Sequence, residues 1–385
     1  MRSSRRNAGV TLLELLVGMS IMLIVTGMAM VSFVTQSQSL RVADMGREAN
    51  ASVRDAMVPI EGAARDLGWG LDPRFAIDLT TATRSVDRFN ATDELAFFAR
   101  DASYRWQDVG EGACTTVGGC FAGNAFAISS ANVGSSPRTV TITLPSGTVL
   151  QKGRVLLAMC AQALNPVMFT LSSTVTGSGS ATTLTPAATN AAPYNDWSSL
   201  QACHGASGAS LFLVNRYHFY VSTSNPPWLM LDTGLDLNGN GTLPPTDPDD
   251  VIPVAKNVED FQVAYILRSS AAFTAPDSNT DWIVGNNRAS AAIEELDPTL
   301  SAPVYATTSA SPLRYNKHPA NVEELRVTLT FRSDKTDKTR RGWAGDSLPG
   351  AENRAGSLSG GQYRRYTNTT QIRLFNMGSK SNFIY

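Results

Sequence analysis

The sequence has few of the residues that usually carry catalysis, and it has no excess of either charge. It contains three histidines and four cysteines in 385 residues, and 32 Lys and Arg balance 33 Asp and Glu. This balance argues against a general nucleic-acid binder, which needs a basic surface. Charged residues make up only 17%, but 43% are hydrophobic, so the chain is not disordered. The composition is typical of a secreted or surface-exposed, β-rich protein.

Catalytic patterns are also missing from the sequence. It has no nucleophile elbow, phosphate-binding loop or HExxH motif, and no acid is placed to form a triad with His204. We therefore expect the three histidines to be structural and the protein not to be an enzyme. His218 lies in a strand-like run, where we expect it to face solvent or to make a hydrogen bond in the core. The alternative, a membrane-anchored hydrolase, requires a catalytic constellation that the sequence does not show.

The N-terminus combines a basic leader with a long apolar run. Residues 1–9 contain three Arg and no acid, and residues 10–34 are apolar apart from Glu14 and a few Ser and Thr. As a helix this run would be about 37 Å long, which is enough to cross a bilayer. It is too long for the apolar core of an ordinary secretory signal. We predict one membrane-spanning helix, with the basic end cytoplasmic and the rest exported.

The residues at the start of the apolar run resemble a type IV prepilin (class III) signal. They read Gly9-Val10-Thr11-Leu12-Leu13-Glu14-Leu15. In that family a prepilin peptidase cuts after the glycine, the new N-terminal residue is N-methylated, and a glutamate stands fifth. The resemblance implies cleavage between Gly9 and Val10 and methylation of Val10, although the family usually has Phe at that position.

Glu14 would serve subunit assembly under this interpretation. A carboxylate inside a membrane span is costly unless it has a partner. Cleavage creates a positive amine at Val10, and an ion pair between that amine and Glu14 of a neighbouring subunit would fix the axial register of the helices. The alternative is that Glu14 lies near the membrane surface, where its charge is cheap.

An amphipathic pattern continues after the apolar run. Apolar or small residues recur at steps of three and four, with one step of seven, which predicts a helix with a single apolar stripe. Pro59 removes one backbone donor and can kink this helix. We expect the helix to end near residues 67–70, which include two glycines, and the stripe to pack on the chain's own head rather than on a partner. The stripe consists of Leu40, Ala43, Gly46, Val53, Met57, Ile60, Ala64 and Leu67.

Beyond Gly70 the pattern is that of β-strands separated by polar loops. The resemblance to pilins implies an α+β fold in which the long N-terminal helix packs on an antiparallel β-sheet head with large loop insertions. We divide the chain into a cleaved leader (1–9), the N-terminal helix (10–68) and the exported head (69–385). Long surface loops are expected at Ser172–Trp197 and Ala271–Asn316. Strands are expected at Leu95–Phe98, Val140–Leu144, Val155–Met159, Leu211–Val221, Val258–Leu267, Val322–Phe331 and Gln371–Phe375.

Several internal segments resemble one subfamily, the PilW-like minor pilins. The resemblance implies a minor pilin that joins a minor-pilin complex, primes pilus assembly and ends at or near the pilus tip. Its implied partners are other minor pilins and the major pilin through the N-terminal helix, the prepilin peptidase, the inner membrane before assembly, and, as a further candidate, a tip adhesin. The alternative is a J-type minor pseudopilin of type II secretion. The segments are 53–68, 153–160, 258–265 and 364–373.

The four cysteines all lie in the part predicted to be exported. An even number of cysteines in an oxidising compartment favours disulfides. Three pairings are possible, and we expect Cys114–Cys120, which flank two glycines, together with Cys160–Cys203. The alternative is reduced structural cysteines, and the spacing matches no zinc-ligand pattern.

One polar stretch resembles the calcium loops of EF-hands and dockerins. Residues 236–243 read D-x-N-x-N-G-x-L, and Asp247 is twelfth. Calcium takes oxygen ligands at alternate positions, with a glycine for the turn and a final carboxylate. Asp249 or Asp250 replaces Asp247 if the prolines 244 and 245 redirect the chain, and the alternative is a solvated acidic hairpin without metal. The implied ligands are Asp236, Asn238, Asn240, the Thr242 carbonyl and Asp247.

Overall fold

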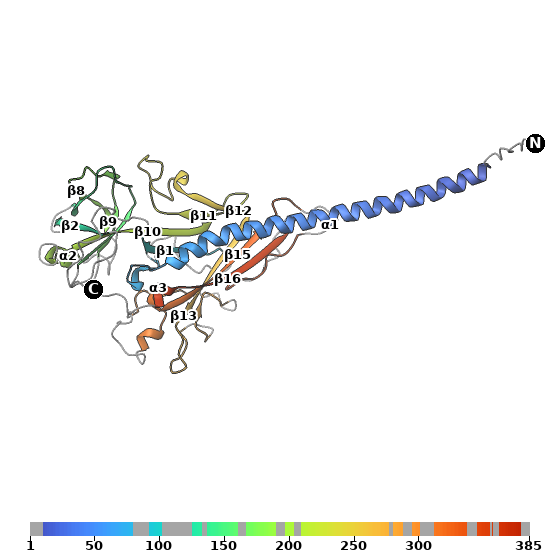
Figure 1. The fold of residues 1–385 in the computed structure, drawn as a ribbon. Coiled ribbons are helices and arrows are strands. Elements are labelled where there is room, and N and C mark those ends of the chain that lie inside the picture. Colours follow the sequence, from blue (N-terminus) through green and yellow to red (C-terminus); the bar gives the residue numbers. More distant parts are fainter. Residues whose placement is uncertain are drawn as a thin grey trace, which may run out of the picture.

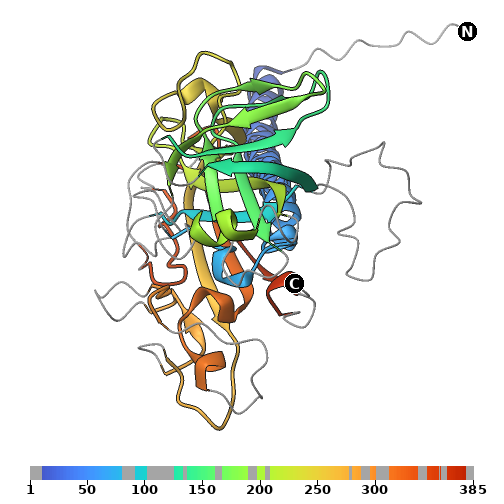
Figure 2. The same cartoon turned by 90° about the vertical axis from the view of Figure 1, so that its left-hand side faces the viewer.

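A computed structural model shows a long N-terminal helix that projects from a β-rich head (Figure 1). Seen from the head end, the green strands and the orange C-terminal segments occupy the upper and lower parts of the head (Figure 2). The structure describes residues 11–79, 92–101, 125–132, 137–160, 167–189, 197–203, 209–276, 280–287, 295–300, 312–336, 345–354, 356 and 362–378.

The helix α1 (Leu12–Asp66) is continuous over 55 residues. It runs through Pro59 without interruption and is capped at Leu67. Gly68 and Gly70 follow with φ angles of 73° and 64°, a left-handed conformation that glycine adopts without steric cost. The predicted end of the helix near residues 67–70 is therefore confirmed.

The second half of α1 packs into the head as the apolar stripe predicts. Met57, Ile60, Ala64 and Leu67 are buried in one core with residues from the sheets. Leu40 is 61% exposed, so the first part of the predicted stripe does not form a seam with the head. The stripe is longer than its seam because the head covers the helix only from about Ala49 onward, the first buried apolar position.

The head contains a large antiparallel sheet in the order β8-β3-β2-β10-β5-β6-β9. Strands β1 and β11 also pair with β10, and β12 pairs with β11. The strands are β1 (Leu95–Arg100), β2 (Ala125–Asn132), β3 (Thr139–Thr143), β5 (Val155–Cys160), β6 (Val167–Leu171), β8 (Ala181–Leu184), β9 (Pro186–Thr189), β10 (Ala209–Val221), β11 (Trp228–Asp232) and β12 (Ile252–Lys256).

A second sheet, in the order β14-β13-β15-β16, lies against α1, and two short strands form a separate pair. The second sheet comprises β13 (Val258–Leu267), β14 (Ile283–Val284), β15 (Val322–Arg332) and β16 (Arg365–Arg373), and the pair is β4 (Val149–Leu150) with β7 (Val175–Thr176). The helical segments are η1 (Pro73–Phe75), α2 (Trp197–Cys203), η3 (Pro248–Asp250), η4 (Pro312–Tyr315), η5 (Pro319–Asn321) and α3 (Phe375–Gly378).

The long strand β10 connects two main hydrophobic cores. Phe219, near its C-terminal end, lies in the core formed by α1, the second sheet and β1. Leu211 and Leu213, near its N-terminal end, lie in a core formed by β2, β3, β5, β6, β8 and α2. The head therefore has more than one core, and one of them includes half of the N-terminal helix. Residues 69–385 alone would expose the surface on which that half of the helix packs.

Each predicted strand overlaps an observed strand, but the last, Gln371–Phe375, covers only the end of β16 and runs into α3, and one predicted loop is wrong in part. The segment 172–197 contains β7, β8 and β9 rather than an unstructured polar connection. Strand β8 reads Ala-Thr-Thr-Leu, and only its Leu184 is buried, so its sequence carries almost no apolar alternation. The segment 271–316 contains β14 and η4, with further residues that lie outside the described part of the chain.

Candidate functional sites

The N-terminal end of α1 is built by a reciprocal cap between Thr11 and Glu14. The backbone N–H of Thr11 donates to Glu14 Oε2 over 2.9 Å, and the backbone N–H of Glu14 donates to Thr11 Oγ1 over 3.3 Å. A carboxylate at a helix N-terminus also interacts favourably with the helix dipole. Both side chains are exposed, so Glu14 is held in place but remains open to a partner. Gly9 and Val10 lie outside the described residues.

The first half of α1 is apolar and exposed around its circumference. Every described residue from 12 to 34 is exposed, and large aliphatic side chains occupy most of these positions. The hydroxyl groups of Ser20 and Thr26 donate to the carbonyls of Leu16 and Met22 within the helix, over 2.8 and 2.7 Å. Because these hydroxyl groups form their hydrogen bonds within the helix, they need no water as a partner, which suits a helix in lipid. Among the described residues, α1 is the helix long and apolar enough to cross a membrane.

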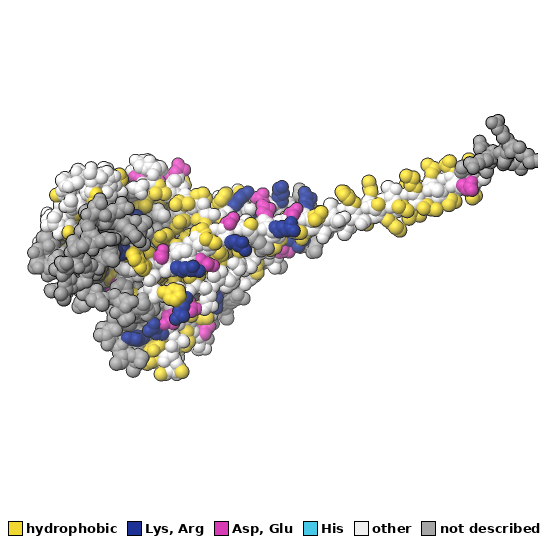
Figure 3. Space-filling model, viewed as in Figure 1, with side chains coloured by type: hydrophobic (Ala, Val, Ile, Leu, Met, Phe, Trp, Pro, Cys, Tyr) yellow, Lys and Arg dark blue, Asp and Glu magenta, His cyan; other side chains and the backbone are white. Residues whose placement is uncertain are grey.

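Charged side chains of both signs gather where α1 meets the head, whereas apolar side chains cover its projecting part (Figure 3). On this stretch Arg47 lies 3.8 Å from Asp44, and Arg65 lies 3.7 Å from Glu61. These pairs are exposed, and such pairs contribute little to stability. The stretch thus marks the change from an apolar to an aqueous environment along one helix.

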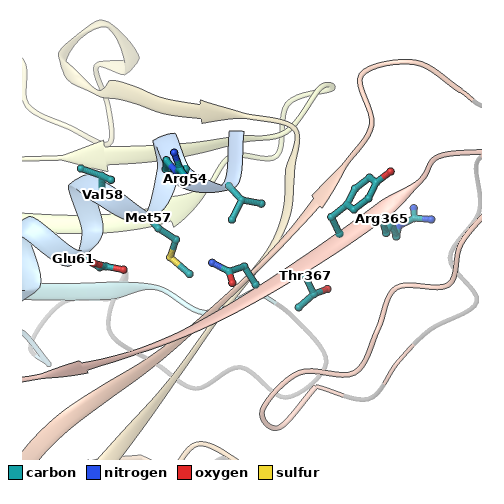
Figure 4. A pocket seen from close by; sticks show the side chains of 9 residues that line it. Arg54, Met57, Val58, Glu61, Arg365 and Thr367 are labelled. Carbon is teal, nitrogen blue, oxygen red and sulfur yellow. The ribbon is translucent and has the colours of Figure 1, made fainter. Parts of the chain in front are cut away.

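A groove of about 780 Å³ lies between α1 and β16. Arg54, Met57 and Glu61 line one side from the helix, and Arg365 and Thr367 line the other from the strand (Figure 4). Arg365 is fixed by hydrogen bonds from Nε and Nη2 to the Glu259 carboxylate, over 2.6 and 3.1 Å. The groove therefore has a structured, polar wall on the side of β16.

The acidic loop, residues 236–250, connects β11 to β12 at the upper edge of the head in Figure 1. The two carboxylate oxygens of Asp236 accept from the backbone N–H groups of Gly239 and Gly241, over 2.7 and 2.9 Å. Asn238 Oδ1 accepts from the N–H of Asn240 over 2.9 Å. The turn that the sequence motif predicts is therefore formed, without flanking helices.

Three of the predicted calcium ligands converge on one another in this loop. Asn238 Nδ2 donates to Asp247 Oδ2 over 2.9 Å, and Asn240 Nδ2 donates to the same oxygen. The Oδ1 atom of Asn240 accepts from the N–H of Thr242 over 2.7 Å. Because Asn238 donates most strongly, followed by the Asp249 N–H and Asn240, the pKa of Asp247 is held below its ordinary value.

The described residues contain no ready-made cluster of three or more His, Cys, Asp or Glu side chains that could hold a metal ion. A metal in the acidic loop would therefore depend on amide and backbone oxygens together with carboxylates. Sequence reasoning named Asp250 only as a substitute for Asp247, yet Asp250 is fully buried against the loop. No local pattern distinguishes it from its exposed neighbour Asp249.

A second group of buried charges surrounds His218, which is buried and hydrogen-bonded as one of the two expectations from the sequence had it, although its charged partners were not predicted. His218 Nε2 lies 3.0 Å from Glu94 Oε2, and its Nδ1 lies 3.3 Å from Asp232 Oδ2. Arg216 donates to Asp232 over 3.0 Å and to Asp78 over 3.3 Å. Burial alone would lower the pKa of His218, but the hydrogen bonds to Asp232 and Glu94 outweigh it, and the pKa is raised.

The cysteine predictions are only partly located by the structure. Cys114 and Cys120 lie outside the described residues. Cys160 is the last residue of β5 and Cys203 the last of α2, and these two elements contact each other, but the two cysteine side chains are not described. Both disulfides remain predictions.

Comparison with known proteins identifies the N-terminal segment alone. Residues 4–30 match the prokaryotic N-terminal methylation motif. This motif supports a pilin-like protein, either a type IV pilin or a pseudopilin. The motif and the exposed apolar half of α1 together fit membrane anchoring before assembly. No curated protein and no solved structure matches the chain.

Proposed function

We propose that this pilin-like chain is a minor pilin that joins a minor-pilin complex, primes assembly of a type IV pilus and stands at or near its tip. The observation that carries the proposal is the division of α1. Its second half is buried in the head, whereas its first half exposes apolar side chains along its whole length. Such a surface is stable in lipid or in a bundle of similar helices, so the chain is built to move from one to the other.

The internal segments that resemble PilW-like minor pilins support the finer assignment. The first, 53–68, covers the end of α1, and the other three supply strands of the head: residues 155–160 are β5, residues 258–265 lie in β13, and residues 365–373 are β16. The head also has two separate main cores. A shaft repeats its subunit at a fixed spacing, whereas a tip is a single position with one free side, which accommodates a bulky head.

The proposal assigns partners to different parts of the chain. The exposed half of α1 contacts the helices of other minor pilins and of the major pilin, and the prepilin peptidase acts at Gly9 and Val10. A tip adhesin is a candidate partner for the head. The inner membrane holds the chain before assembly, and the role requires no catalysis and no nucleic acid.

The decisive experiment deletes this chain and counts pili on the cells while assaying type II secretion. A minor pilin predicts loss of pili with secretion intact, and the wild-type chain should restore pili and co-purify with sheared filaments. Loss of secretion with pili intact would identify a J-type pseudopilin instead. Mass spectrometry of the restored protein should find Val10 at the N-terminus, methylated, and an intact Met1 terminus would contradict the processing step.

A further inference from the structure

The acidic loop contains three carboxylates that are buried without a cationic partner. Asp236, Asp247 and Asp250 are 3%, 6% and 0% exposed. Within the described part of the chain, none of the three forms an ion pair with Lys, Arg or His. Burying a charge is costly unless another charge compensates it. The nearby ammonium group of Lys152 donates to the Gly241 carbonyl over 2.5 Å and not to a carboxylate.

Asp250 provides the observation that points to a missing ligand. Its Oδ1 accepts from the backbone N–H groups of Leu237 and Asn238, each over 2.9 Å, which places the carboxylate against the turn of the loop. Its Oδ2 is buried and has no hydrogen-bond partner. Buried polar atoms are nearly always satisfied, and an exception calls for an ion or a water molecule. A cation bound by the loop would satisfy this oxygen, and because the described carboxylates form no ready-made cluster, the loop would have to close around the ion.

We propose that the acidic loop binds one calcium ion through Asp236, Asn238, Asn240, the Thr242 carbonyl, Asp247 and Asp250. The oxygen-only donor set excludes zinc and other metals that prefer nitrogen or sulfur. Calcium accepts six to eight oxygens in a flexible arrangement, whereas magnesium demands near-ideal octahedral geometry and keeps its waters. On binding, Asp247 exchanges the amide N–H groups of Asn238 and Asn240 for the metal, and Asp250 Oδ2 gains its partner.

The loop that would hold the ion is already joined to a neighbouring turn of the large sheet. The N–H of Asp236 donates to the Lys152 carbonyl over 3.1 Å. Gly153 follows with a φ of 85°, and an added Cβ there would lie 2.0 Å from the Gly234 carbonyl oxygen. This close approach requires glycine, so the loop is already seated on the turn before β5. Calcium would stiffen a loop that these contacts already join to a segment about 80 residues earlier in the sequence.

Calorimetry on the full-length chain in detergent, after removal of divalent ions, tests the site with calcium chloride. We expect one calcium per chain, with a dissociation constant of about 10⁻⁴ to 10⁻³ M, as in extracellular calcium modules. Asp250→Asn removes one charge without changing the shape of the side chain and should weaken binding about tenfold or more. Asp249→Asn is the matched control, because Asp249 is adjacent and exposed, and it should bind calcium as the wild type does.

Thermal melting separates a lost ligand from a lost fold. The wild type and Asp249→Asn should melt at a higher temperature in calcium than in chelator, because calcium binds the folded state. Asp250→Asn should melt in chelator at or above the wild-type temperature and should gain little from calcium. Asp236→Asn provides an independent second variant with the same expectation for binding. The proposal is overturned if the wild type takes up no calcium at several millimolar, or if Asp250→Asn binds as tightly as Asp249→Asn. Neither readout depends on the role of the chain in pilus assembly.

Discussion

The two halves of α1 differ both in how their apolar side chains are distributed and in what surrounds them. From Leu12 to Val34 the apolar side chains are exposed in the described part of the molecule, whereas between Ala49 and Leu67 one face of the helix forms part of the main core. The first half can be stabilised only by lipid or by other chains, and the second half is stabilised by the head that it helps to build. Under the proposed function, assembly and folding thus depend on different turns of one continuous helix.

The largest expected effect compares two isoleucines on this helix. Ile60 is 0% exposed and Ile24 is 58% exposed. Ile60→Ala should lower the free energy of unfolding of the head by about 2–5 kcal/mol, because it leaves a cavity in the core. Ile24→Ala should change it by less than about 0.5 kcal/mol. Urea denaturation of both variants in detergent, followed by tryptophan fluorescence, measures the difference, and equal effects would remove the distinction between the halves.

A smaller effect is expected in the pH dependence of stability, which arises from the buried charges around His218. His218 faces Glu94, Asp232, Arg216 and Tyr220. Because its pKa is raised on folding, its contribution to stability is fully present below the ordinary pKa of about 6.5 and is lost as pH rises through the folded value.

We therefore expect the wild type to lose stability as pH rises from about 6.5, with a slope of at most about 1.4 kcal/mol per pH unit for this one proton. His218→Gln should flatten that part of the profile. Thermal melts from pH 6 to pH 8 measure both curves, and parallel curves for the two proteins would show that His218 is not the group responsible.

The smallest effect on folding is expected at Glu14, where the effect on assembly is expected to be large. Glu14 is exposed, and among the described residues its side-chain hydrogen bonds are made with the cap of its own helix, so Glu14→Gln should leave the melting temperature of the head unchanged. It should fail to restore pili in cells that lack the chain, because the neighbouring amine loses its partner. Glu48→Gln, on the exposed surface of the same helix, is the control that should restore them. Wild-type pilus numbers with Glu14→Gln would show that pairing between subunits does not involve this residue.

The sequence predicted the elements whose apolar residues repeat with a regular period. The helix end near Leu67 and the strand over 258–267 were located closely, because caps and alternation are local signals. Strand β12 was missed, since it is an edge strand that contains Pro253 and is mostly exposed. Leu40 was predicted to be part of the apolar stripe but is exposed, because a periodic stripe does not reveal how far the head reaches along the helix.

The candidate sites were predictable only where their residues are close in the sequence. The turn at 236–242 follows from a short motif. Arg216 and Asp78, by contrast, are 138 residues apart, so their ion pair arises only from the folding of the sheet. Asp250 lies against the turn of the loop because the chain folds back toward that turn at η3, Pro248–Asp250. No residue pattern in the sequence predicts this change of direction.

The polar stretch of α1 between its two halves also acts as a spacer. Residues 35–48 span about 21 Å at the rise of an α-helix. Electrostatic interactions are screened over about 8 Å at physiological ionic strength. In a chain anchored through residues 12–34, the head would therefore stand beyond the distance at which its charges interact with lipid headgroups.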